Sequence, residues 1–180
     1  VIETLHANLL LLNPSQRWVS IRQPPINPAY AIAECLWFVM GRNDSCFINS
    51  WNSQLKNYAG VSDKYHGAYG FRLINHFGIN QLSAACDALN SDSTSRQIVL
   101  QIWDTKVDLP NGDGKPRNKD IPCNVLSLLK VRDRKLEWTQ IVRSNDLFLG
   151  VPYNIVLFTF LQELMASWLK VGMGHFYQLS

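Results

Sequence analysis

One stretch of the sequence constrains the fold more than any other, because it predicts a β-hairpin. Residues 125–131 are rich in strand-forming side chains, residues 132–134 form a charged turn, and residues 135–142 return as a second strand. Two strands paired in this way place the start of the first beside the end of the second. The hairpin therefore brings Cys123 and Arg143 to the same end of a sheet.

The side chains at that end have simple chemical uses. A cysteine acts as a nucleophile in its thiolate form, which a nearby guanidinium such as that of Arg143 favours. Arg143 and Ser144 together offer a bidentate cation and a hydroxyl, a suitable grip for a phosphate. Asn154 carries a donor and an acceptor side by side and can read an amide-like edge such as that of uracil. From spacing alone, a buried thiol and a capped turn explain these residues as well.

Composition limits the class of protein. A chain of 180 residues with 47% hydrophobic and 17% charged residues predicts one globular domain over residues 1–180. The net charge of +3 suits an anionic small molecule and is too weak to indicate nucleic-acid binding. The apolar stretch 154–169 is interrupted by Gln162 and Glu163, which argues against a membrane span. The four cysteines show no metal-ligand spacing, so we expect no metal site and a reducing, cytoplasmic location.

The remaining pattern predicts a single α+β domain with one mixed β-sheet covered by helices. We expect further strands at 5–12, 17–22 and 98–103, helices at 29–40, 44–57, 78–89 and 155–170, and a polar loop at 105–120. Gly172 and Gly174 are predicted to end the last helix in a turn. The chain starts without Met inside an apparent strand, so we expect it to be incomplete at both ends.

A longer pattern indicates a family. Residues 143–155 read RSNDLFLGVPYNI and follow Pro122-Cys123 by about twenty positions. This arrangement resembles the thymidylate synthase signature R-S-x-D-x-x-L-G-x-P-F-N-I, which follows P-C at the same spacing. Three further segments resemble that family: Glu34 lies in a helix similar to E-L-L-W-F-L-x-G, Trp51 matches a W-D element, and Tyr69 matches a G-P-V-Y-G loop.

The resemblance implies that a one-carbon unit passes from 5,10-methylenetetrahydrofolate to C5 of a pyrimidine nucleotide monophosphate. The expected reaction methylates deoxyuridylate to dTMP through a covalent bond between the cysteine and C6 of the base. The implied catalytic residues are Cys123, Glu34, Asp146 and Tyr69. The implied nucleotide-binding residues are Arg143, Ser144, Asn154, Trp51 and, from the other subunit of a homodimer, Arg96. Asp146 and Gly150 are implied to place the folate.

The sequence departs from the family pattern near the nucleotide. Asn124 stands where the family has His, Val142 and Gln97 replace a Gln and an Arg, and Gln54 replaces a Trp. These changes favour, as an alternative, a hydroxymethyltransferase of the same fold in which water takes the place of hydride. Asn154 indicates a uracil-type base, because relatives that use cytidylate carry an acid there. A third alternative is a nucleotide-binding protein without turnover, for which the thiol would be unnecessary.

Overall fold

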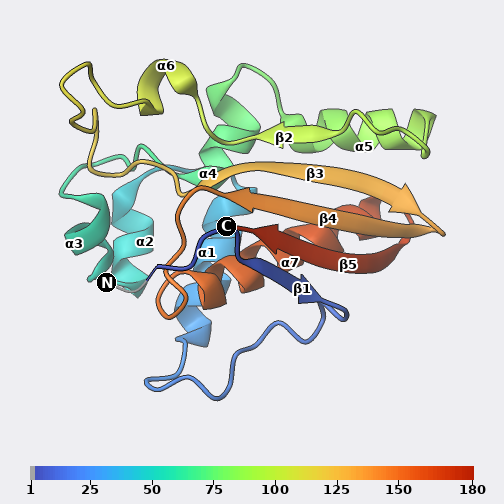
Figure 1. The fold of residues 1–180 in the computed structure, drawn as a ribbon, viewed down its shortest axis with the longest axis horizontal. Helices are drawn as coiled ribbons and strands as arrows, with labels where there is room; N and C mark the ends of the chain where they lie inside the picture. The colour runs from blue at the N-terminus through green and yellow to red at the C-terminus, as the bar shows by residue number, and fades with distance from the viewer. Residues whose placement is uncertain (1–2) are drawn as a thin grey trace.

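The computed structural model describes residues 3–180, which form a mixed five-stranded sheet with helices packed on one face (Figure 1). The strands are β1 (Asn8–Leu11), β2 (Val99–Gln101), β3 (Asn124–Arg132), β4 (Lys135–Val142) and β5 (Gly172–Leu179). Their order across the sheet is β1-β5-β4-β3-β2. β4 and β5 run parallel, whereas the other three pairs are antiparallel. The predicted α+β class with one mixed sheet is confirmed.

The helices are α1 (Pro28–Val39), α2 (Ser45–Trp51), α3 (Leu55–Ala59), α4 (Tyr69–Phe71), the π-helix η1 (Arg72–His76), α5 (Gln81–Ser91), α6 (Thr105–Asp108) and α7 (Val151–Trp168). Several of them begin at polar caps that the sequence supplies. The side chains of Asn27, Asp44 and Asn80 accept hydrogen bonds from the first turns of α1, α2 and α5. The predicted helices at 29–40, 78–89 and 155–170 are therefore present, with ends shifted by a few residues.

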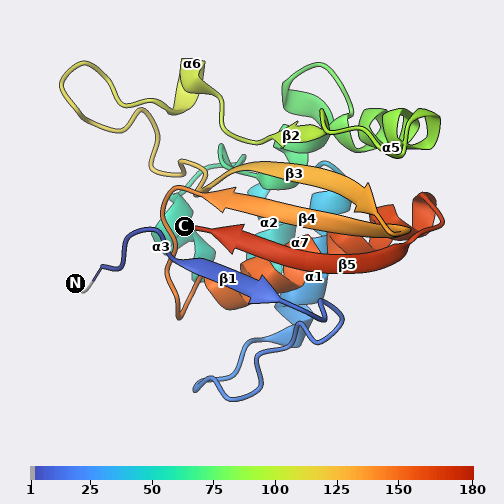
Figure 2. The same ribbon diagram turned by 45° about the vertical axis from the view of Figure 1, so that its right-hand side comes forward.

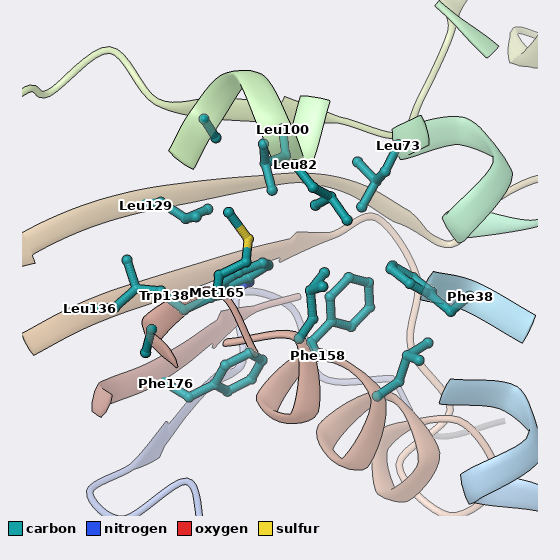
Figure 3. Close-up of a cluster of buried hydrophobic side chains, with 14 of the residues drawn as sticks. Phe38, Leu73, Leu82, Leu100, Leu129, Leu136, Trp138, Phe158, Met165 and Phe176 are labelled. Atoms are coloured by element: carbon teal, nitrogen blue, oxygen red, sulfur yellow. The ribbon is translucent and has the colours of Figure 1, made fainter. Parts of the chain in front are cut away.

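The hydrophobic core lies between the sheet and the helices α1, α5 and α7 (Figure 3). Trp138 of β4 is fully buried and packs against Phe158 of α7, with ring centroids 6.4 Å apart. Phe38 of α1 meets the same Phe158 edge to face at 5.9 Å. The long apolar helix α7 thus fixes the sheet relative to α1, which carries Glu34.

The opposite face of the sheet is uncovered within residues 3–180 (Figure 2). Large apolar side chains lie exposed on it in several strands: Leu10 on β1, Val99 on β2, and Tyr177 and Leu179 on β5. An antiparallel or mixed sheet with one exposed apolar face has surface available for a partner.

The predicted hairpin is confirmed. β3 and β4 pair from Arg132↔Lys135 to Asn124↔Val142, with a bulge near the open end. The turn residues Asp133 and Arg134 both adopt positive φ, at 50° and 56°, as a tight two-residue hairpin turn requires.

The predicted strand at 17–22 is wrong. The segment does not join the sheet, and its two arginines contact residues that lie on α7 or just before it. Arg17 is buried in an ion pair with Glu163 of α7, and Arg22 donates from Nε to the carbonyl of Phe148 over 2.8 Å. Ile21, which alternation would bury, is 90% exposed.

The predicted turn after α7 is also wrong, because residues 172–179 form β5. This strand lies between β1 and β4, and its short sequence carries no clear strand pattern of its own. Gly174 is needed where the strand passes Glu137: an added Cβ would lie 2.6 Å from the Glu137 carboxyl carbon and 3.0 Å from the Leu136 carbonyl. Gly174 therefore permits the close approach of β5 to β4 at this point.

The predicted helix at 44–57 is divided in two. The chain leaves helical geometry at Asn52, whose side chain accepts a hydrogen bond from the amide of Gln54 over 3.1 Å. The new helix α3 follows. The predicted loop at 105–120 begins with the short helix α6, capped by Asp104.

Candidate active site

Cys123 and Arg143 meet at the open end of the hairpin. The Arg143 amide donates to the Cys123 carbonyl over 2.9 Å, which continues the strand pairing by one residue. The Arg143 guanidinium reaches back and donates to the carbonyls of Pro122 (2.9 Å) and Ile121 (3.2 Å). It also lies over the ring of Trp103, 5.2 Å from its centre. The half-buried free thiol of Cys123 is thus held on a backbone that Arg143 braces.

The loop that delivers Cys123 is anchored to the segment that carries Tyr69. At its start, the buried carboxylate of Asp108 accepts from both Nη atoms of the buried Arg72, at 3.1 and 3.0 Å, and contacts His66 at 2.6 Å. At its end, Asp120 accepts from the Gly67 amide over 2.7 Å. Burial raises the pKa of Asp120, against the opposing effect of the Gly67 hydrogen bond. The two attachments fix the loop on either side of its exposed middle.

The Tyr69 hydroxyl lies within electrostatic range of both the Cys123 thiol and the Glu34 carboxyl group. Burial raises the pKa of the Tyr69 hydroxyl well above its usual range, and negative charge on Cys123 and on Glu34 raises it further. The Tyr69 ring packs on Phe158 at 6.0 Å. These interactions place Tyr69 between α1 and the start of β3, as a neutral hydroxyl group that can donate a hydrogen bond.

Glu34 is the most perturbed carboxylate of the site. Burial within α1 raises its pKa to about 7, although the Tyr30 hydroxyl, which donates to Oε1 over 3.1 Å, lowers it. Tyr30 meets Tyr153 of α7 edge to face at 5.2 Å, and the Tyr153 hydroxyl accepts from the Asn27 amide over 2.9 Å. A carboxyl group with a pKa near neutrality is suited to proton transfer.

Asn154 lies in the first turn of α7 and is connected to the sheet. Its Oδ1 accepts from Asn124 Nδ2 over 3.4 Å, and Asn124 Oδ1 accepts from Gln140 Nε2 over 3.0 Å. The structure therefore joins Asn154 to the residue next to Cys123.

The turn before α7 is organised by Asp146. One oxygen, Oδ1, accepts from the amides of Phe148 (2.8 Å) and Leu149 (2.6 Å), and the Asp146 carbonyl accepts from Gly150 (2.9 Å). Gly150 is the N-cap residue of α7. Ser144 lies exposed in the same connection, and Trp51, at the end of α2, is 47% exposed.

Arg96 is not brought to this site. It precedes β2, and the pairing of Val99 with Leu128 puts it toward the hairpin-turn end of β3, opposite to Cys123. Arg96 can serve such a site only from another copy of the chain.

The sequence interpretation missed the polar side chains behind Asn154. Ser127, Trp138 and Gln140 join Asn124 in one buried hydrogen-bonded group. One signal was available: Gln140 occupies a core-facing position of β4, between Trp138 and Val142, where an apolar residue is expected.

Within 3–180, no three His, Cys, Asp or Glu side chains lie together in a way that would hold a metal ion. In the same range, no helix combines the length and apolar character needed to cross a membrane.

These observations define a class: an α+β protein with a free cysteine beside an arginine at the end of its sheet, and a tyrosine within electrostatic range of both that cysteine and a helix carboxyl group. The family model of thymidylate synthase matches residues 21–180. The chain belongs to the thymidylate synthase family.

Three relatives illustrate the range of similarity. The chain is 33% identical over 171 residues to a deoxyuridylate hydroxymethyltransferase of Pseudomonas phage M6, covering 94% of this chain and 47% of that protein. It is 33% identical to the deoxyuridylate hydroxymethyltransferase of Bacillus phage SP01, covering 93% and 46%. It is 28% identical to a thymidylate synthase of Francisella tularensis subsp. holarctica, covering 79% and 56%. The chain therefore spans about half the length of the curated relatives it matches.

Proposed function

We propose that the protein transfers a one-carbon unit from 5,10-methylenetetrahydrofolate to C5 of deoxyuridylate. The observation that carries this proposal is that Tyr69 lies within electrostatic range of both Cys123 and Glu34, while Asn154 is hydrogen-bonded to Asn124, the residue next to Cys123, in a chain of this family. Cys123 would form a bond from Sγ to C6 of the uracil, which makes C5 nucleophilic. Arg143 would hold the peptide that carries the thiol and, with Ser144, the phosphate.

The proton transfers fall to Glu34 and Tyr69. Because its pKa is about 7, Glu34 can hold a proton at neutral pH and release it to, or take it from, the base. The neutral Tyr69 hydroxyl would donate a hydrogen bond beside the thiol. Asn154 would contact the N3–H and O4 edge of uracil with its acceptor and its donor.

The residues present fit a folate. The exposed apolar side chains of Leu147 and Phe148 follow Asp146 directly and offer a surface for a flat heteroaromatic ring. Asp146 keeps Oδ2 available, since Oδ1 is used in the turn. Bound methylenetetrahydrofolate would supply the one-carbon unit. Asp146 and Gly150 are the residues proposed to hold it.

Two products are candidates. Methylation to dTMP is the outcome that the resemblance to thymidylate synthase implies. Hydroxymethylation is favoured by one observation: two relatives that match more than 90% of the chain, at 33% identity, are named deoxyuridylate hydroxymethyltransferases. In that reaction water, and not hydride, would add to the one-carbon unit on the base before Cys123 leaves C6.

The test uses the protein at the full length of its gene, incubated with methylenetetrahydrofolate and either deoxyuridylate or deoxycytidylate. Mass spectrometry of the nucleotide distinguishes methyl from hydroxymethyl, and dihydrofolate appears only with methyl. Cys123→Ser should abolish turnover, while Cys46→Ser, an exposed cysteine on α2, should not. Binding of nucleotide with no product would instead support a protein that has kept the fold and lost the reaction.

A homodimer is part of this proposal. The uncovered sheet face is apolar, and Arg96 lies at the wrong end of its own sheet to reach the Cys123 site. A second copy bound to this face would bury its apolar side chains and would allow Arg96 of one copy to serve the Cys123 site of the other. Sedimentation velocity at micromolar concentration should show a dimer that Tyr177→Glu dissociates; a wild-type monomer would contradict this part of the proposal.

A further inference from the structure

A chain of side-chain hydrogen bonds runs from the hydrophobic core to Asn154. Ser127 Oγ and Trp138 Nε1 both donate to Gln140 Oε1, over 2.6 and 3.1 Å. Gln140 Nε2 donates to Asn124 Oδ1 over 3.0 Å, and Asn124 Nδ2 donates to Asn154 Oδ1 over 3.4 Å. The first three amide and hydroxyl side chains, Ser127, Gln140 and Asn124, are completely buried. Asn154, at the end, is half-buried.

The direction of this chain is set by Trp138. An indole N–H is only a donor, so the Gln140 atom beside it must be the carbonyl oxygen. Gln140 is then obliged to present its NH₂ group to Asn124, and Asn124 in turn presents its own NH₂ group to Asn154. Trp138 is held in place by the core, where its ring packs between β4 and α7 (Figure 3). Each amide in the chain thus has one orientation that leaves no donor facing a donor.

We infer that Trp138, Gln140 and Asn124 are positioning residues that fix the orientation of the Asn154 amide, and so which of its groups meets position 4 of the base. With Oδ1 turned toward Asn124, the Nδ2 donor of Asn154 is turned outward. An outward donor pairs with a carbonyl oxygen, as at position 4 of uracil, and opposes the amino group at position 4 of cytosine. The second acceptor position of Oδ1 stays available for N3–H. This inference rests on the proposed function, because it concerns the same base site.

The neighbouring strand supplies a contrast. Gln178 of β5 pairs in register with Gln140 and is equally buried, yet neither polar atom of its side chain has a hydrogen-bond partner among residues 3–180. Burial on this face is therefore not enough to make a glutamine part of the hydrogen-bond chain that ends at Asn154. Gln178 offers a matched control, with the same side chain at the same sheet level.

The decisive variant is Gln140→Glu. A carboxylate accepts at both oxygens, so Asn124 would have to present NH₂ to it and Oδ1 to Asn154. Asn154 would then donate inward and present Oδ1 to the base, which suits cytosine. Three donors around the new carboxylate favour its ionised form, and measurements at pH 8 maintain it. The matched variant Gln178→Glu buries the same charge at a position outside this hydrogen-bond chain.

The readout is the ratio of dissociation constants for deoxyuridylate and deoxycytidylate, measured by calorimetry without folate. We expect Gln140→Glu to shift the ratio toward deoxycytidylate by roughly tenfold or more, and Gln178→Glu to leave it unchanged. Trp138→Phe, which keeps an aromatic ring and removes the N–H, should shift it in the same direction by less. Equal shifts in the two glutamate variants, or an unchanged ratio in Gln140→Glu, would overturn the inference.

One outcome separates this inference from the proposed function. If the wild type binds deoxyuridylate but yields no product, the proposed function fails and the binding ratios still decide the inference. If Gln140→Glu does not fold, Trp138→Phe decides it, because an unchanged ratio there would mean that the indole N–H does not set the Asn154 amide. A wild type that binds neither nucleotide would overturn both.

Discussion

The amide of Arg143 donates to the carbonyl of Cys123 over 2.9 Å, and the guanidinium of the same arginine donates to the two carbonyls that precede the cysteine. One residue therefore closes the end of the hairpin and holds the peptide before the thiol. The side chain remains exposed, and its Nη1 makes no hydrogen bond within residues 3–180, so its N–H groups can donate to an anion. The Arg143 side chain thus both positions the peptide before Cys123 and places a positive charge beside it.

Arg143→Lys should lower kcat/KM by on the order of tenfold to a hundredfold, because lysine keeps the charge and loses the fork that reaches two carbonyls. Steady-state kinetics measure the loss. The matched control is Arg132→Lys at the other end of the same hairpin, which should retain activity. Equal activity in both variants would contradict the bracing role.

Glu34 makes stability depend on pH. Its pKa in the folded protein is about 7, raised from 4.5 by burial, so its contribution is fully present below pH 4.5 and is lost as the pH rises through 7. Glu34→Gln should remove this loss and stabilise the protein at pH 8 relative to wild type, by up to about 3 kcal/mol. Urea unfolding at pH 5 and pH 8 measures it. Glu3→Gln, at an exposed site, should behave as wild type at both pH values.

Glu34→Gln should also show no turnover at any pH, because glutamine cannot exchange the proton that Glu34 is proposed to carry. The wild-type rate should instead change with pH around 7. A Glu34→Gln variant that is more stable at pH 8 and fully active would separate the buried carboxyl group from the reaction.

The buried pair of Arg72 and Asp108 should carry much of the stability of the Cys123 loop. Asp108→Asn leaves the guanidinium of Arg72 buried without its counter-charge, and we expect a loss of about 3–5 kcal/mol in the free energy of unfolding. Asp113→Asn removes an exposed partner of Lys115 and should cost less than about 1 kcal/mol. Similar losses in the two variants would show that the buried pair is not special.

Gly70→Ala should disturb the approach of α4 to α1. An added Cβ would lie 2.5 Å from the Cα and 2.6 Å from the carbonyl carbon of Phe38, which are backbone atoms that cannot turn aside. We expect a loss of about 3 kcal/mol or more, measured by chemical denaturation. Gly112→Ala, where an added Cβ meets no atom within 4 Å, is the control. Wild-type stability in Gly70→Ala would mean that the two helices are not closely packed.

Several features were predictable because their causes are local. The hairpin of β3 and β4 depends on a short turn between two strand-like runs, and α1 on a cap and on side chains within four residues of one another. The meeting of Cys123 with Arg143 follows from the hairpin alone. Glu34 could be singled out because a carboxylate in an apolar helix needs an explanation.

Other features depend on contacts between residues far apart in the sequence. The segment 17–22 has a strand pattern, but the partners of Arg17 and Arg22 lie on and before α7, more than a hundred residues away. Strand β5 forms because β1 on one side and β4 on the other supply its hydrogen bonds. No local sequence pattern indicates which distant residues these partners are.

The amino-acid sequence is enough to predict which chemical groups meet at the hairpin end, because strand pairing across a tight turn permits one register. The orientation and protonation of those groups depend on how the elements pack together. Asn154 receives its orientation from Trp138 through Gln140 and Asn124, and the pKa of Glu34 is raised by the packing around α1. Both effects arise from burial and from donors placed by other elements, so they exist only once the core has formed.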